Sequence, residues 1–228
     1  MPVVLPQNPE PPNLPLAPRE YEERYHDQTN NVLRLYFNRL RNLLSAILGT
    51  DFGPTIKFPN IGAYYYPDQY ATAANTPTIV LWNDTSSLSG FTLNANNTAT
   101  ATYAGTYKIT YSLELANSDN AAHDVVCWLR LNGDTSAADI ANSTTVFTVP
   151  ARKSAGVYSY ICAYSEVVFD LAAGDSVGLW WGTDQAATSG GALGIWMYAR
   201  AAQTTPMPYP ETPSAIGSIT FVSTPASA

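Results

Sequence analysis

The sequence is poor in the side chains that most enzymes use for catalysis. Its 228 residues include only two histidines, and charged residues make up 13% of the chain, about half of the usual share. It contains no Gly-x-Ser-x-Gly, His-Glu-x-x-His or phosphate-loop motif. Two Cys and two His without metal-ligand spacing do not form a zinc site. We therefore expect no catalytic residue, no metal and no cofactor.

Cysteine is also scarce. The two cysteines, Cys127 and Cys162, are too few for a disulfide framework. Each falls within a predicted strand, so we expect two buried thiols that act as small apolar side chains. A bridge between them would require the two strands to be neighbours in the right register, and the sequence leaves that open.

The sequence has no long apolar run and no excess of positive charge. No stretch approaches the roughly 18 apolar residues that cross a membrane. Residues 1–7 (MPVVLPQ) lack the basic start and apolar core of a signal peptide, so we expect none. The formal net charge is −7, and residues 60–200 carry most of it. Because an acidic domain repels phosphate backbones, we expect no nucleic-acid binding. Because no long apolar stretch is present, we expect no membrane insertion.

Proline is plentiful at the start of the chain, where residues 1–18 contain seven prolines. Proline fixes the backbone φ angle and removes the amide donor, so this arm is predicted to be extended and semi-rigid. Apolar residues between the prolines favour a tether that lies in a groove of a partner over the alternative, a disordered tail. The candidate anchor residues are Val3, Val4, Leu5, Leu14, Leu16 and Pro18.

An amphipathic helix is predicted over residues 19–49, because Pro18 suits a first turn, acidic residues follow it, and Gly49 suits a helix end. Apolar residues at spacings of 4, 3, 4 and 3 form a heptad seam. So wide an apolar surface must be buried against another part of the protein or against another chain. Bundling with copies of itself is the favoured interpretation, and packing on its own β-domain is the alternative. The seam consists of Leu33, Phe37, Leu40, Leu44 and Ile47.

A β-domain is predicted over residues 61–201, after a linker at residues 50–60 that is rich in chain-breaking residues. Many short alternating segments separated by turn signals are typical of a sandwich or barrel. The predicted strands include residues 106–115, 124–132 and 176–182, and the alternation of apolar and polar residues is clearest over 106–115. Trp128 and Trp180 fall on the face opposite the core, which favours a subunit interface over a ligand platform.

The C-terminal residues 202–228 resemble the N-terminal arm in chemistry. Four prolines between positions 206 and 213 precede a short apolar run, Ile216–Val222. This pattern predicts a strap across the surface or onto a neighbour. We expect the strap to end in an edge strand that is added to a sheet.

Four segments in this order resemble complement-C1q-like domains. Residues 104–111 (AGTYKITY) resemble the strand P-G-x-Y-x-F-x-Y of that family, with alanine in place of proline. Residues 125–133 (VVCWLRLNG) resemble V-x-L-x-x-N-G, and residues 171–179 (LAAGDSVGL) resemble L-x-x-G-D-x-V-x-L. Residues 189–198 stand in the place of the closing strand, without its phenylalanines. The matched residues are Gly105, Tyr107, Tyr111, Asn132, Gly133, Gly174 and Asp175.

The resemblance carries an expectation about architecture. This family and the related tumour necrosis factor fold form ten-strand jelly rolls that assemble as compact homotrimers. It therefore implies an all-β, ten-strand jelly-roll sandwich, preceded by the arm and the helix, in a homotrimer whose exposed loops bind partners. The Pro-rich arm together with the run 14–38 resembles virion proteins of tailed bacteriophages.

These patterns lead to one main expectation and two alternatives. We expect a non-enzymatic bacteriophage virion protein, assembled in the host cytoplasm, whose partners are its own copies and other capsid or tail proteins. It would be a capsid decoration or short fibre anchored by its arm. One alternative is a tail-associated receptor-binding tip that recognises host surface glycans. The other is a glycan depolymerase, which needs two carboxylates in an aromatic-lined cleft. A calcium ion held by loop carboxylates is left open.

Overall fold

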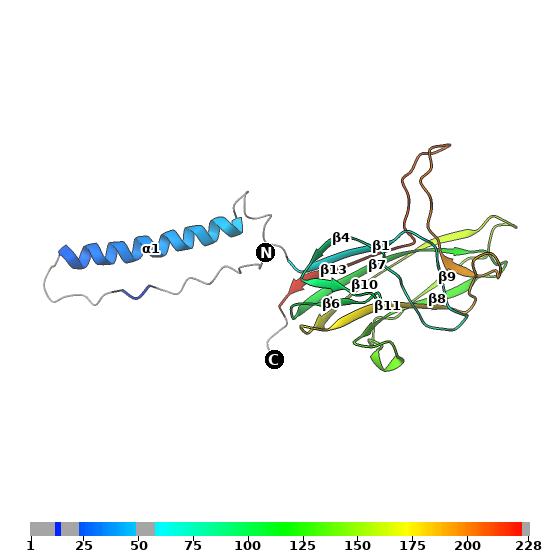
Figure 1. Cartoon of the computed structure of the whole chain (residues 1–228), viewed down its shortest axis with the longest axis horizontal. Coiled ribbons are helices and arrows are strands. Elements are labelled where there is room, and N and C mark those ends of the chain that lie inside the picture. Colours follow the sequence, from blue (N-terminus) through cyan, green and yellow to red (C-terminus); the bar gives the residue numbers. More distant parts are fainter. Residues whose placement is uncertain (1–11, 15–22, 49–57, 225–228) are drawn as a thin grey trace. The chain divides into compact units, whose positions relative to one another are not determined.

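The computed structural model describes residues 12–14, 23–48 and 58–224. The chain divides into two compact units, Met1–Lys57 and Phe58–Ala228. In the described part of the first unit, helix α1 spans Glu23–Leu48, within the predicted range 19–49. The second unit consists mainly of strands (Figure 1).

Thirteen strands lie within the described part of the second unit, so the expected count of ten is not confirmed. Several of the strands have only two or three residues. The strands are β1 (Asn60–Tyr65), β2 (Gln69–Tyr70), β3 (Thr78–Ile79), β4 (Asp84–Ser89), β5 (Phe91–Leu93), β6 (Ala99–Ala101), β7 (Gly105–Asn117), β8 (His123–Leu131), β9 (Thr145–Val149), β10 (Ser159–Leu171), β11 (Ser176–Thr183), β12 (Ile195–Met197) and β13 (Ala215–Ser223). A short 3₁₀ helix, η2 (Ser136–Ala138), lies between β8 and β9.

The strands form two sheets, and every pair of these strands is antiparallel. Sheet A has the order β2-β12-β7-β13-β1-β4, with β10 also paired to β7. Sheet B has the order β5-β6-β11-β8-β9, with β3 also paired to β11. The chain passes from sheet A to sheet B after β7, returns for β10, crosses again for β11 and ends in sheet A. Two antiparallel sheets connected in this way form a jelly roll.

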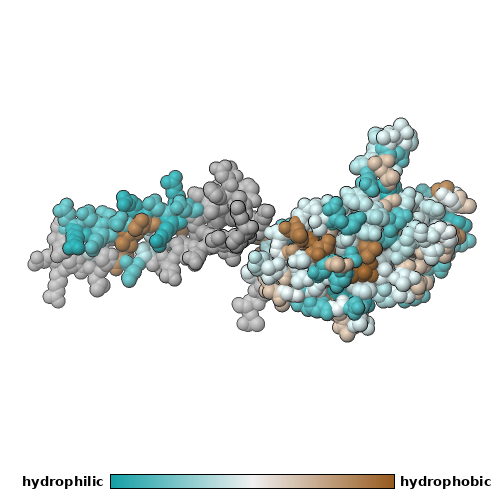
Figure 2. Space-filling model, in the orientation of Figure 1, coloured by the Kyte–Doolittle hydropathy of each residue, from teal (hydrophilic) through white to brown (hydrophobic). Residues whose placement is uncertain are grey.

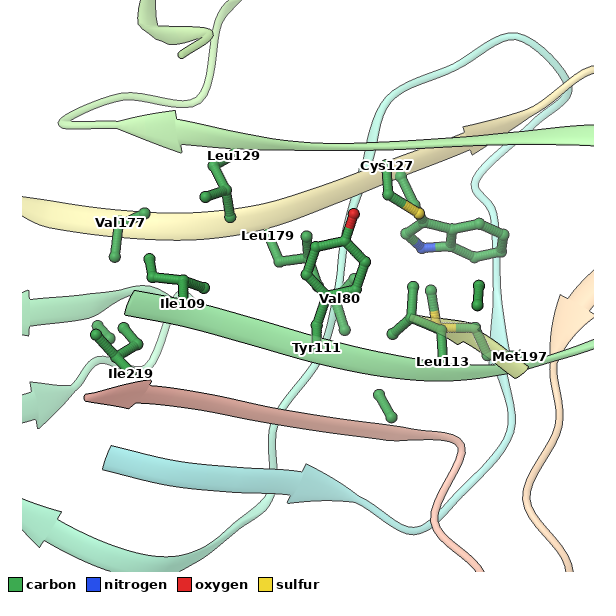
Figure 3. Close-up of a cluster of buried hydrophobic side chains, with 14 of the residues drawn as sticks. Val80, Ile109, Tyr111, Leu113, Cys127, Leu129, Val177, Leu179, Met197 and Ile219 are labelled. Carbon is green, nitrogen blue, oxygen red and sulfur yellow. The ribbon is translucent and has the colours of Figure 1, made fainter. Parts of the chain in front are cut away.

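The core lies between the two sheets. Along β7 the side chains alternate between buried and partly exposed, as a strand with one face on the core requires. Ile109, Tyr111 and Leu113 from β7 point toward Leu129 and Leu179 of sheet B (Figure 3). Full burial of each large apolar side chain contributes about 1.5–3 kcal/mol. The alternation predicted for residues 106–115 is therefore confirmed.

The last strand lies in the interior of sheet A. β13 pairs with β1 on one side and β7 on the other, so that Ile219 lies opposite both Ile61 and Ile109. The predicted edge strand is therefore wrong, and the sandwich extends well past residue 201. The expected closing strand at residues 189–198 is also wrong. Residues 189–198 contain only the short strand β12, which pairs with the last residues of β7. β13 pairs with the rest of the same edge of β7.

Residues 200–212 project from the sandwich as a hairpin (Figure 1). Backbone bridges join Arg200 to Thr212 and Gln203 to Tyr209. Met207 lies near the tip and is largely exposed. The prediction that this Pro-rich segment lies across the surface of its own domain is wrong, because the bridges pair the segment with itself.

A small cavity of about 50 Å³ lies beside the core, lined mainly by apolar residues of both sheets. The Trp82 ring is part of its wall, next to Gly217 of β13. A Cβ atom placed on Gly217 would lie 2.8 Å from Cη2 of Trp82. Glycine inside a strand marks such close approaches, so the ring can lie here only because position 217 has no side chain.

Candidate functional site

The outer face of sheet A carries a group of exposed apolar side chains. We call the outward residues of β7, β10, β12 and β13 the sheet A face. Its apolar members are between 41% and 58% exposed, whereas the residues between them on the same strands are mostly buried or half-buried. Clusters of this kind on a monomer mark interaction sites. The exposed apolar residues are Tyr160, Tyr164, Val168, Ile216 and Val222.

The sheet A face borders an open strand edge. β10 is 13 residues long and, among the described residues, it pairs only with β7. The backbone amides and carbonyls on its other edge are therefore available to a further chain. A long edge without a cover is prone to pairing with other chains, and proteins usually cover or interrupt such edges.

The centre of the sheet A face is polar but carries little charge. Oγ1 of Thr110 and Oγ of Ser218 are 2.7 Å apart, and Nζ of Lys108 lies 3.5 Å from Oε2 of Glu166. Both side chains of this ion pair are more than two-fifths exposed, so the pair contributes little to stability. The other charged residues at outward positions of β7 and β10 are Glu114 and Asp170. On the side seen in Figure 2, apolar patches interrupt a mostly neutral and hydrophilic surface.

Aromatic side chains gather where β7 ends. Tyr160 and Trp196 are the register partners of Ala116 on its two sides. The Trp196 ring meets Tyr158 edge to face at 5.0 Å, and Tyr160 stacks on Tyr198 at 5.3 Å. Edge-to-face and offset-stacked pairs stabilise each other beyond simple burial. This cluster was not predicted from the sequence. Tyr158 and Tyr160, two aromatic residues separated by one position, were a signal for it.

The predicted interface residues Trp128 and Trp180 lie side by side on the outer face of sheet B, as register partners in β8 and β11. The guanidinium carbon of Arg130 lies 4.1 Å from the centre of the Trp180 ring. Arg130 is 4% exposed, and its Nε donates to Oδ1 of Asp139 at 2.6 Å. Nε1 of Trp128 donates to the same oxygen at 2.8 Å. Both rings thus have contacts within the chain, and their interface role stays a prediction.

Two of the family-like motifs meet in space. Asn132, at the end of β8, and Asp175, in the turn before β11, are joined by a hydrogen bond. Asn132 and Gly174 have φ angles of +57° and +91°, which asparagine and glycine tolerate best. These motif residues shape two adjacent turns.

The other motif residues support the core. Tyr107 and Tyr111 are buried, and the Tyr107 hydroxyl donates to the carbonyl oxygen of Tyr103 at 2.8 Å. A Cβ atom on Gly105 would lie 2.6 Å from the Phe221 ring. A Cβ atom on Gly133 would lie 3.0 Å from Cβ of Ala138. The conformations at Gly105 and Gly133 therefore reflect close packing.

The predicted helix seam is partly described. Leu33 and Leu40 are half-buried, whereas Phe37 and Leu44 are exposed on α1. The side chain of Ile47 lies outside the described residues. Of the predicted anchor residues, Leu14 is exposed, and Val3, Val4, Leu5, Leu16 and Pro18 lie outside the described residues. Among the described residues, no helix is long and apolar enough to cross a membrane.

His123 lies between two carboxylates. Its Nε2 is 2.9 Å from Oδ2 of Asp119, and its Nδ1 is 3.2 Å from Oδ1 of Asp184. Burial acts to lower the pKa of His123, but the hydrogen bonds to both carboxylates outweigh it and raise this pKa above 6.5. The pKa of Asp119 is lowered, chiefly by the hydrogen bond to His123. This cluster ties the start of β8 to the end of β11.

The two cysteines lie in different environments. Cys127 points into the core, and burial raises the pKa of its thiol to about 12. Cys162 is exposed on the sheet A face, with Sγ 3.1 Å from Oγ of Ser112. The prediction of two buried thiols is therefore wrong for Cys162, because its position on β10 faces outward. Both cysteines are free. Within the described chain no three His, Cys, Asp or Glu side chains form a metal site.

Comparisons with known proteins identify no family for this chain. No family model matches the chain, and no curated protein matches it. Among solved structures, it is similar to Eiger TNF from S. frugiperda, with a TM-score of 0.44 and 12% identity. That alignment covers 75% of this chain and 98% of the other. The jelly-roll assignment rests on the strand order of this chain itself.

Proposed function

We propose that the chain is a non-enzymatic structural protein of a bacteriophage virion that assembles as a homotrimer through the sheet A face. The observation that carries this proposal is the exposed apolar group on β10 and β13 beside the open edge of β10. A second copy of the chain is the occupant that matches this surface best. A neighbouring copy would cover apolar side chains and protect the open edge of β10.

Helix α1 also supports the proposed homotrimer. α1 carries apolar residues at heptad spacing, and Phe37 and Leu44 of this seam are exposed. Three copies would bring three such seams together, and a bundle of helices buries them. A seam of about two heptads is short, so we expect the helices to depend on the sandwiches for association.

The virion part of the proposal is supported by the Pro-rich arm and by the sequence resemblance to virion proteins of tailed bacteriophages. In a trimer, three arms would bind the particle together. Once one arm is bound, the other two bind as if at high local concentration, so that weak single contacts give firm attachment. The role would be that of a capsid decoration or a short fibre.

The trimer is tested by the mass of the purified full chain in sedimentation equilibrium. We expect three times the 24.6 kDa of one chain. Val168→Glu should reduce the mass to that of the monomer, because it places a charge inside the contact. Val168 is more than half exposed in the single chain, so we expect the Val168→Glu monomer to stay folded.

Val146→Glu is the matched control. Val146 is as exposed as Val168 but lies on β9 of sheet B, so the trimer mass should not change. A monomeric wild-type chain, or equal effects of both variants, would contradict the proposed contact. Cryo-EM of purified particles tests the virion part. Copies in threes on the capsid or tail support it, and the absence of the chain from particles would overturn it.

A further inference from the structure

A second feature of sheet A is a pocket beside the aromatic cluster. Its volume is about 230 Å³, below the roughly 300–1,000 Å³ of sites for drug-sized ligands. It therefore suits a ligand of the size of one sugar ring. Two kinds of surface line it, namely aromatic rings and a polar turn. The lining residues used below are Tyr70, Ser118, Tyr158, Thr188, Gly190 and Trp196.

The aromatic wall of the pocket is held in place. Trp196 pairs with Tyr70 in the β12–β2 register and meets Tyr158 edge to face. Trp196 is 6% exposed and packs on Ala116 and Ala187. Rings that are fixed in advance lose little entropy when a ligand binds, which favours affinity.

The polar wall is a tight turn at residues 188–192. Oγ1 of Thr188 accepts a hydrogen bond of 2.8 Å from the amide of Ala192, and the amide of Gly191 donates to the carbonyl oxygen of Thr188. Gly190 has a φ angle of +80°, and no atom lies within 4 Å of the place where its Cβ would be. The turn is thus fixed by its own bonds and leaves open space above Gly190.

One donor in the pocket wall is unsatisfied. Nε1 of Trp196 is buried and has no hydrogen-bond partner in the part of the chain that the structure describes. Leaving a buried donor unpaired is unfavourable, because the donor has lost its hydrogen bonds to water. Nε1 has almost no accessible surface, so an acceptor oxygen on a ligand would pair with this donor only after the pocket wall moves. A purely apolar ligand or a quaternary ammonium ion has no such acceptor.

The charges around the pocket narrow the class of ligand. No Lys or Arg lines it, and the Tyr70 hydroxyl lies 3.4 Å from Oδ2 of Asp68. No charged side chain of the described residues lines the pocket, so its wall offers an ion of either sign no partner. From these contacts we infer that the pocket binds a neutral saccharide unit, with a ring face on the aromatic side chains and hydroxyl groups at Nε1 of Trp196 and at the polar turn.

The position of the pocket agrees with a binding role. β1 begins at Asn60, whose partner Thr220 pairs with Lys108 near the start of β7. The pocket residues Ser118 and Trp196 lie at the opposite end of β7. The pocket therefore lies at the end of sheet A away from the point where the chain enters the sandwich. This inference does not depend on the virion, and it requires that the trimer contact leave this end of the sheet A face open.

Saturation-transfer difference NMR on the full chain tests the inference. The probes are methyl glycosides of glucose, galactose, mannose and N-acetylglucosamine at millimolar concentration, with tetramethylammonium as a competing class. We expect transfer to the ring protons of at least one glycoside. Trp196→Phe keeps a ring but removes Nε1, and it should weaken that binding about 2- to 10-fold. Tyr158→Ala removes a half-buried ring and should weaken it about tenfold.

Trp180→Phe is the matched control, because Nε1 of Trp180 is also buried without a partner in the described residues but lies on sheet B. It should leave glycoside binding unchanged. The inference is overturned by absence of transfer to every glycoside, by equal binding in all variants, or by binding of tetramethylammonium alone. It is also overturned if Trp196→Phe alters the mass of the assembly and leaves glycoside binding intact, since the cluster is then a subunit contact.

Discussion

Asn132 and Asp175 are 43 positions apart in the sequence, and Nδ2 of Asn132 donates a hydrogen bond of 2.7 Å to Oδ1 of Asp175. The second carboxylate oxygen accepts from the amide of Ala172 at 2.7 Å, while Oδ1 of Asn132 accepts from the amide of Ser176 at 2.8 Å. One carboxylate and one amide thus fasten the end of β8 to the turn between β10 and β11.

Asp175→Ala should therefore lower the free energy of unfolding by about 1–2 kcal/mol, because two hydrogen bonds to the carboxylate are lost at a partly exposed site. The measurement is urea unfolding at a fixed protein concentration, since unfolding of an oligomer depends on concentration. Asp134→Ala, in the loop after β8, should change stability by less than about 0.5 kcal/mol. Equal decreases in the free energy of unfolding in both variants would show that the hydrogen bonds of Asp175 do not stabilise the fold more than an ordinary surface carboxylate does.

Gly217→Ala should destabilise the sandwich by about 1–3 kcal/mol, because the new methyl group meets the Trp82 ring and forces it to move. The combination with Trp82→Leu tests this cause. If the clash is responsible, the double variant should lose clearly less stability than the sum of the two single variants. Additive losses in urea unfolding would mean that Trp82 is not the neighbour that matters.

The His123 cluster predicts a dependence of stability on pH. The folded-state pKa of His123 is raised above 6.5, so its contribution is complete below that value and is lost as the pH rises through the folded-state pKa. The midpoint of unfolding in urea should decrease as the pH rises above 6.5. Asp119 has a lowered pKa, so its contribution is present above 3.8 and is lost in stronger acid.

His123→Gln should remove the decrease above pH 6.5, whereas His26→Gln, on α1, should retain it. NMR titration of the His123 ring protons gives the pKa directly. A value at or below 6.5 in the folded protein would contradict the contacts with Asp119 and Asp184.

Much of the sandwich could be predicted from the sequence, because its long strands carry their own pattern. Predicted strands over residues 106–115, 124–132 and 176–182 correspond closely to β7, β8 and β11. Alternating burial imposes a period of two on these segments, and that period is visible in the residues alone. β4 was missed, because its mainly polar sequence DTSSLS lies at the edge of sheet A.

The place of β13 could not be predicted in the same way. Its apolar residues indicate a strand, but only its hydrogen bonds to both β1 and β7 decide that it is interior. That pairing joins positions more than 100 residues apart, and a local pattern carries no information about it. The aromatic pocket was missed for the same reason, since Tyr70, Tyr158 and Trp196 come from three distant segments.

The place of β13 also bears on how the chain folds during synthesis. β1 and β7 are made before the strand that joins them, which follows only after β8 to β12. Until then both strands expose an unpaired edge, and such edges invite association with other chains. Contacts between distant positions also slow folding. A chain cut short before residue 215 would keep most of its core residues but leave a gap in the middle of sheet A.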